Sequence, residues 1–206
     1  IEGGLVKTVG SQTCNDSGEF GFVLNTTSFR STSAGNIFFG RTLTGNGGDL
    51  NVGLSGELVG NLTVSQALTA VDDLTVFAAN ATITNTGNAV SNTVSFQTTG
   101  NVNHFESGAV LIETSEVGGA LNLSSANGGI STSATGQIRA NSISLSASDA
   151  GSGGNITIGT GGICTTDTSG ACGGAGAAIR LHAADNLTIN GPIISNGGNI
   201  TMVAGT

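Results

Sequence analysis

The sequence predicts an all-β protein, a parallel β-helix (β-solenoid) with about 20 residues per coil. The main observation is a short phrase of alternating polar and apolar residues that returns through the last third of the chain. Its copies there are residues 142–145 (SISL), 155–158 (NITI), 186–189 (NLTI) and 199–202 (NITM). Alternation with a period of two is the pattern of a strand that buries one face.

The spacing of these copies is the second observation. Further copies lie upstream at residues 49–52, 61–64, 73–76 and 120–123, and Gly, Asn or Asp, which permit sharp turns, border most of them. Stacked coils of about 20 residues place on the order of ten coils in the chain. The apolar spacings that favour this period are Leu50–Leu62–Leu74 (twelve apart), Leu54–Leu74–Val94 (twenty), Leu121–Ile143 (twenty-two) and Ile143–Ile163 (twenty).

Composition excludes several other classes. The chain has 35 Gly but one Pro, and 37% hydrophobic against 9% charged residues, which fits neither collagen nor a disordered chain. A net charge of −8 disfavours nucleic-acid binding. No apolar run approaches the roughly 20 residues that span a bilayer. No sustained helical stripe is present, so a β-sandwich is the competing architecture.

The pattern divides the chain into two parts. Residues 1–44 form an irregular β segment, either a cap or the start of the solenoid, and hold five of the eight Phe residues. Those Phe residues predict either a thicker part of the core or an aromatic cap over its open end. Residues 45–206 carry the repeats, which an excursion at 164–177 interrupts. Stacking is expected to form continuous apolar columns, with Asn side chains forming ladders at the turns.

The stretch 184–202 (ADNLTINGPIISNGGNITM), together with 136–159 and 47–86, resembles filamentous haemagglutinin-type repeats of exoproteins exported by two-partner secretion. The resemblance covers roughly residues 45–206. It implies a right-handed parallel β-helix and a role in adhesins, filaments or carriers of effectors. The Asn-Pro-Asn secretion signature of that family is absent, because the one Pro is Pro192, so the chain does not match the family's secretion domain.

The cysteines are the clearest site candidates. Cys164 and Cys172 bracket the Thr/Ser/Gly-rich excursion, and a disulfide between them fits an oxidising, extracellular setting; two free, buried thiols are the alternative. Cys14 has no evident partner in the chain. The Cys-x7-Cys spacing without a nearby His pair disfavours zinc.

The remaining candidates indicate no catalytic, cofactor or metal residues. His104 and His182 are both expected on the solvated surface. The carboxylates at Asp72, Asp73 and Glu113, with Glu116, do not form a converging set with the five Lys and Arg residues, as carbohydrate cleavage would require. Residues 45–50 weakly match a single copy of a Ca²⁺-binding repeat, and turn formation explains them better.

We therefore expect a structural or adhesive segment of a secreted or cell-surface β-helical filament or large adhesin, without catalysis. The alternating pattern of polar and apolar residues extends to both ends of the given sequence. The expected partners are therefore neighbouring coils of a longer chain or identical subunits end to end. A host-cell or glycan surface is a further candidate partner. The alternatives are a carbohydrate-binding or carbohydrate-cleaving β-helix, which the lack of Trp and Tyr disfavours, and a strand-exchanging pilin-like subunit, which predicts a sandwich.

Overall fold

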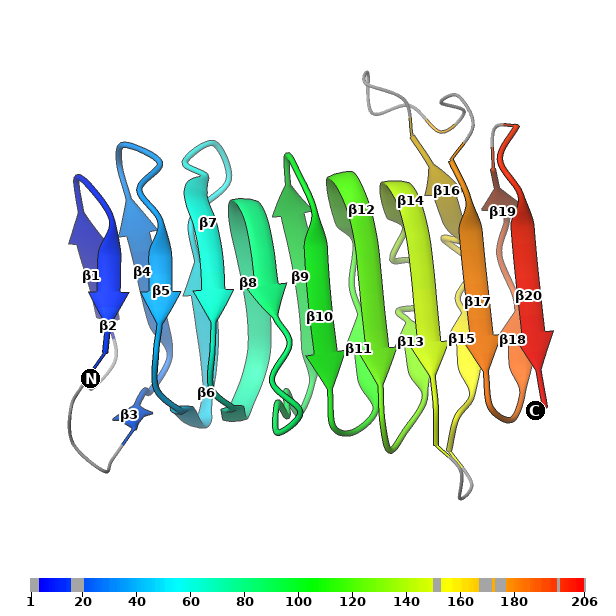
Figure 1. Cartoon of the computed structure of the whole chain (residues 1–206), viewed down its shortest axis with the longest axis horizontal. Coiled ribbons are helices and arrows are strands. Elements are labelled where there is room, and N and C mark those ends of the chain that lie inside the picture. Colours follow the sequence, from blue (N-terminus) through cyan, green and yellow to red (C-terminus); the bar gives the residue numbers. More distant parts are fainter. Residues whose placement is uncertain are drawn as a thin grey trace.

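The computed structural model describes residues 4–15, 21–149, 153–166, 172, 177–195 and 197–205. Within them the chain is all-β, and its parallel strands stack into a β-solenoid of about 8 turns, roughly 22 residues apart (Figure 1). The predicted fold class is confirmed, and the competing sandwich is not formed. The coils are fewer than the ten expected because several of them are lengthened at their corners.

The strands of the described residues follow one another in a single stacked sheet. Their bounds are β1 (Gly4–Thr8), β2 (Gln12–Cys14), β3 (Phe22–Val23), β4 (Thr27–Ser31), β5 (Ile37–Phe39), β6 (Leu43–Val52), β7 (Val59–Val64), β8 (Leu68–Ile83), β9 (Thr93–Thr98), β10 (Val102–Glu106), β11 (Val110–Ile112), β12 (Ser115–Ser125), β13 (Ile130–Thr132), β14 (Ile138–Ala147), β15 (Ile156–Ile158), β16 (Ile163–Thr165), β17 (Ile179–Ala183), β18 (Leu187–Ile189), β19 (Ile193–Ile194) and β20 (Ile200–Ala204).

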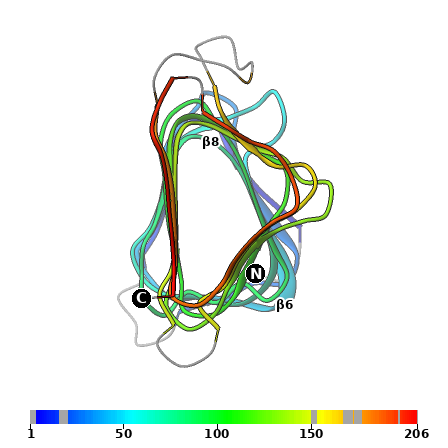
Figure 2. The same ribbon diagram turned by 90° about the vertical axis from the view of Figure 1, so that its right-hand side faces the viewer.

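Each coil has three faces. The front face in Figure 1 consists of β2, β5, β7, β10, β17 and β20 with the C-terminal halves of β8, β12 and β14. It forms the straight left side of Figure 2, and we call it the flat face. In Figure 2 the chain runs down the flat face and up the opposite side while approaching the viewer, so the coil is right-handed.

Alternation along the strands places columns of apolar side chains inside the coil. On the flat face Leu121 stacks on Ile143, and the column continues through Ile179 to Ile200. These columns are buried except at the last coil, where Ile200 is 42% exposed. The main-chain hydrogen bonds run between coils, so each coil depends on its neighbours for both its backbone partners and its apolar contacts.

Asparagine ladders at a corner confirm a second expectation. The main-chain N–H of Asn61 donates to Asn36 Oδ1 at 2.8 Å, and Asn80 Nδ2 donates to Asn61 Oδ1 at 2.8 Å. The N–H of Asn101 donates to Asn80 Oδ1 at 2.7 Å, and the N–H of Ala120 continues the ladder by donating to Asn101 Oδ1 at 2.8 Å. The ladder satisfies backbone donors that a turning chain would otherwise leave without partners.

The N-terminal strands belong to the same stack. β1 pairs with β4, β2 with β5, and β3 with β6, all in parallel. Phe29 and Phe39 are buried and pack edge to face, with ring centroids 4.8 Å apart. Phe38 points outward from the flat face between Thr13 and Thr63, and Phe20 lies outside the described residues. The buried pair thus thickens the core at this end.

Close stacking requires glycine at particular corner positions, and Gly118 in β12 provides a test. A Cβ there would lie 2.3 Å from the main-chain oxygen of Thr99, which belongs to the coil below. We expect Gly118→Ala to lower the free energy of unfolding in urea by about 1–3 kcal/mol, because the backbone of one coil must move. Gly108→Ala is the matched control, since a Cβ there meets nothing within 4 Å. Equal stability of the two variants would contradict this account of the packing.

Candidate functional site

The structure joins Cys164 and Cys172 by a disulfide, with their Cα atoms 5.5 Å apart. Cys164 is fully buried in β16, and Cys172 returns to form a single antiparallel bridge with Thr166. The bond therefore fastens the base of the excursion to the solenoid wall. Residues 167–171 and 173–176, which make up most of the predicted excursion, lie outside the described residues.

Cys14 is a free, half-buried thiol at the end of β2. Burial raises the pKa of the Cys14 thiol above its ordinary value, because the charged thiolate is less well solvated there. A higher pKa reduces the thiolate fraction at neutral pH and so reduces its reactivity.

The two histidines differ from each other. His182 is exposed on β17, as expected. The expectation for His104 is wrong: it is only 2% exposed and lies inside the coil. The reason is the alternation of β10, in which Val102, His104 and Glu106 all point inward. The in-phase spacing of His104 with Val102 was the sequence signal that indicates burial.

His104 and Glu106 form a pair in the solenoid interior. His104 Nε2 lies 2.8 Å from Glu106 Oε1, and both side chains are fully buried. The two atoms are close, but their geometry does not form a hydrogen bond. Among the described residues, Nδ1 of His104 also lacks a hydrogen-bond partner. The other carboxylate oxygen, Glu106 Oε2, accepts the main-chain N–H of Val90 at 3.1 Å. The ring of Phe96 packs on the imidazole, with centroids 5.4 Å apart.

Asn88 extends this buried polar cluster. Its Oδ1 accepts the N–H of Leu68 at 2.9 Å, and its Nδ2 donates to the carbonyls of Ile83 and Phe105. Asn88 is fully buried. Between β8 and β9 the chain forms only a single parallel bridge, Val71–Val90, and Asn88 and Glu106 accept the N–H groups of Leu68 and Val90 beside it. We interpret the cluster as structural, because it completes the hydrogen bonding where strand pairing is reduced to one bridge.

Carboxylates gather at one place among the described residues. Asp49, Asp72 and Asp73, all partly exposed, have carboxylate oxygens within 4.8 Å of one another. Asp73 Oδ1 already accepts hydrogen bonds from the N–H and the hydroxyl of Thr93. Glu113 and Glu116 do not belong to this group. Hydrogen bonding within the coil corner accounts for Asp73.

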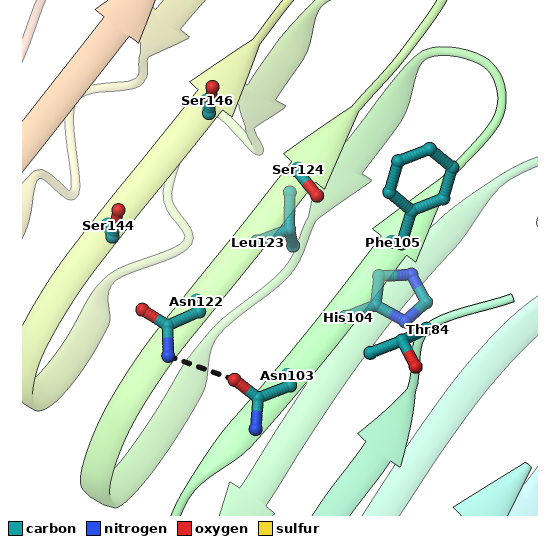
Figure 3. Close-up of a pocket in the computed structure, with 9 residues that line it drawn as sticks. All are labelled: Thr84, Asn103, His104, Phe105, Asn122, Leu123, Ser124, Ser144 and Ser146. Atoms are coloured by element: carbon teal, nitrogen blue, oxygen red, sulfur yellow. Dashed lines mark hydrogen bonds between the residues drawn. The ribbon is translucent and has the colours of Figure 1, made fainter. Parts of the chain in front are cut away.

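Two adjoining hollows lie on the outer surface of the flat face. The first, of about 240 Å³, crosses β10, β12 and β14, and Figure 3 shows its side chains. The second, of about 320 Å³, continues it toward β17 and shares Asn122 and Ser144 with the first. Sequence reasoning missed this surface because outward Ser and Asn residues in a strand carry no distinctive signal before the coils are aligned.

Comparisons with protein-family models, with curated proteins and with solved structures found no match. Among the described residues no helix is long and apolar enough to cross a membrane. Inferences about function therefore depend on the solenoid itself, its ends and its surface.

The buried pair gives a prediction about stability. His104→Leu fits the column between Ile83 and Leu123, but it leaves the Glu106 carboxylate buried without its partner. We expect a loss of about 3 kcal/mol in the free energy of unfolding. Adding Glu106→Gln should recover most of the loss, because the uncharged amide oxygen still accepts the Val90 N–H. Urea unfolding of both variants checks this, and a double variant no more stable than His104→Leu would contradict it.

The disulfide gives a second prediction about stability. Cys172→Ser should reduce the free energy of unfolding by about 2 kcal/mol, because the short loop is no longer closed in the unfolded chain. A reducing agent should produce the same loss in the wild-type protein and none in the variant. Cys14→Ser serves as the control and should leave the response to reductant intact. A wild-type protein insensitive to reductant would show that the bond does not contribute to stability.

Proposed function

We propose that this chain is a structural and adhesive segment of a secreted or cell-surface β-helical filament or large adhesin, and that it is not an enzyme. The observation that carries the proposal is the stacking itself, in which a strand inside the stack pairs in parallel with a strand of the coil on either side. Among the described residues, β1, β2 and β3 each pair with one neighbouring strand, as do β18, β19 and β20. In the described part of the chain, the first and last coils therefore each have one strand edge without a partner on each of the three faces.

Apolar side chains gather at the same two ends. Among the described residues, the large apolar side chains that stay exposed include Leu5, Val9 and Val23 near the first coil, and Ile189, Ile194, Ile200 and Met202 in the last. Leu54, on the turn between β6 and β7, is the exception. Exposed apolar surface next to unpaired strand edges is typical of a site that binds another strand.

A further coil of the same kind fits either end. The inward columns reach the last coil through the in-register pairs of β15 with β18, β16 with β19 and β17 with β20, so an added coil would continue them. We expect this coil to come from a longer chain or from an identical subunit. Because the contact is head to tail and does not close on itself, repetition gives a filament. The pilin-like alternative loses its support, since it required a sandwich.

Two further observations favour an extracellular location. The Cys164–Cys172 disulfide is typical of oxidising compartments. The recurring Asn-apolar-Thr-apolar phrase resembles filamentous haemagglutinin-type repeats, and in this solenoid its apolar positions form the buried columns. The flat face then presents a long row of ordered polar side chains, which suits spacing, display and adhesion at low entropic cost.

Association through the ends is the test. In sedimentation velocity and negative-stain microscopy, we expect the protein to form end-to-end rods that lengthen with concentration. The double variant Ile200→Asp/Met202→Asp should remain short, because it places charges over the open core. Leu54→Asp is the matched control, since Leu54 is exposed to 43% and Ile200 to 42%. Free monomers at all concentrations, with no effect of either variant, would overturn assembly from identical subunits.

A further inference from the structure

We infer that the two hollows on the flat face form one groove that binds a mostly neutral oligosaccharide carrying a carboxylate at one end. This inference rests on the proposed adhesive function and names the ligand class of its surface. The groove is defined by two in-register rows of outward side chains. The first row is Asn103, Asn122, Ser144 and Arg180, and the second is Phe105, Ser124, Ser146 and His182.

The sizes of these side chains create the groove. Ser124, Ser144 and Ser146 are small and occupy the middle of the rows, whereas Phe105 stands at one end and Arg180 at the other. Neighbouring strands lie about 4.8 Å apart, so the three steps from β10 to β17 span about 14 Å. The result is a shallow trough across four strands, long enough for a short chain of linked rings.

The lining chemistry fits a saccharide. In Figure 3 the Phe105 ring and the hydroxyl groups of the serines flank the same hollow, which offers an apolar surface beside hydrogen-bonding groups. A pyranose ring has an apolar C–H face that packs on an aromatic ring and hydroxyl groups at its edge. Asn122 Nδ2 donates to Asn103 Oδ1 at 2.9 Å, which orients both amides and leaves further donor and acceptor positions for sugar hydroxyls.

Arg180 determines the charge of the ligand. It is exposed on β17, and among the described residues it forms no ion pair. Its guanidinium can bind a carboxylate through two parallel hydrogen bonds. The lining of the first hollow contains no Asp, Glu, Lys or Arg. Because the whole chain carries a net charge of −8, it repels strongly anionic polymers, and a glycan with a single acidic sugar is the better partner.

The test uses calorimetric titration with a glucuronic-acid-capped xylo-oligosaccharide and the same oligosaccharide without the acid. We expect the wild-type protein to bind the acidic probe more tightly. Phe105→Ala should weaken binding of both probes by about tenfold, and Arg180→Gln should weaken only the acidic one by about tenfold. Arg180 is exposed and Phe105 is half-buried on the outer surface, so both variants should stay folded, which far-UV circular dichroism checks.

Two matched controls lie outside the groove. Phe38→Ala removes an outward aromatic ring from the same face, on β5, and Lys7→Gln removes a positive charge on β1. Neither should change binding. No binding of either probe, or equal weakening by the control variants, would overturn the inference. Rods that still form without saccharide binding would remove this inference alone, whereas binding without end-to-end association would remove the filament role and leave the groove.

Discussion

The structure depends above all on the hydrogen-bond ladder between one coil and the next. A single coil is too small to bury its apolar side chains or to pair its own backbone, so neither can be satisfied until coils stack in register. Register then fixes which side chains meet. Leu121 lies over Val102 and under Ile143 because their strands pair there, and the corner asparagines align for the same reason. Stability is therefore shared along the rod, and among the described residues the first and last coils each contact one neighbouring coil instead of two.

The same constraint explains where one coil of this chain differs from the next. Corners accept loops of different length as long as the strands on either side regain their register, which is how the excursion closed by Cys164 and Cys172 is tolerated. Where strand pairing is reduced to a single bridge, polar side chains add hydrogen bonds, as Asn88 and Glu106 do. Side chains that point outward do not have to stack in the core or satisfy buried backbone groups. Function is therefore expected at the outward rows and at the ends, and not in the interior.

Sequence alone predicted the solenoid, its apolar columns and its asparagine ladders, because the alternating phrase and its turn residues report directly on strand geometry. It predicted register less well. Leu121 and Ile143 do pair, but Ile143 pairs with Ile179 and not with Ile163, and Leu54 is exposed on a turn. Coil length varies at the corners, so spacing along the chain does not give the neighbour in space. The flat-face groove could not be predicted from the sequence for the same reason, because its residues come together only when the coils are aligned.

The central claim is that coils support one another, so that a strand with a partner on each side is more stable than β1–β3 or β18–β20, which have one partner each among the described residues. Hydrogen–deuterium exchange of the wild-type protein, at a concentration below association, tests it most directly. The account predicts the slowest amide exchange in the middle of the stack, from β8 to β14, with protection falling toward β1–β3 and β18–β20. Protection at the end strands equal to that in the middle would contradict it, because each end would then have to be closed by contacts other than a neighbouring coil.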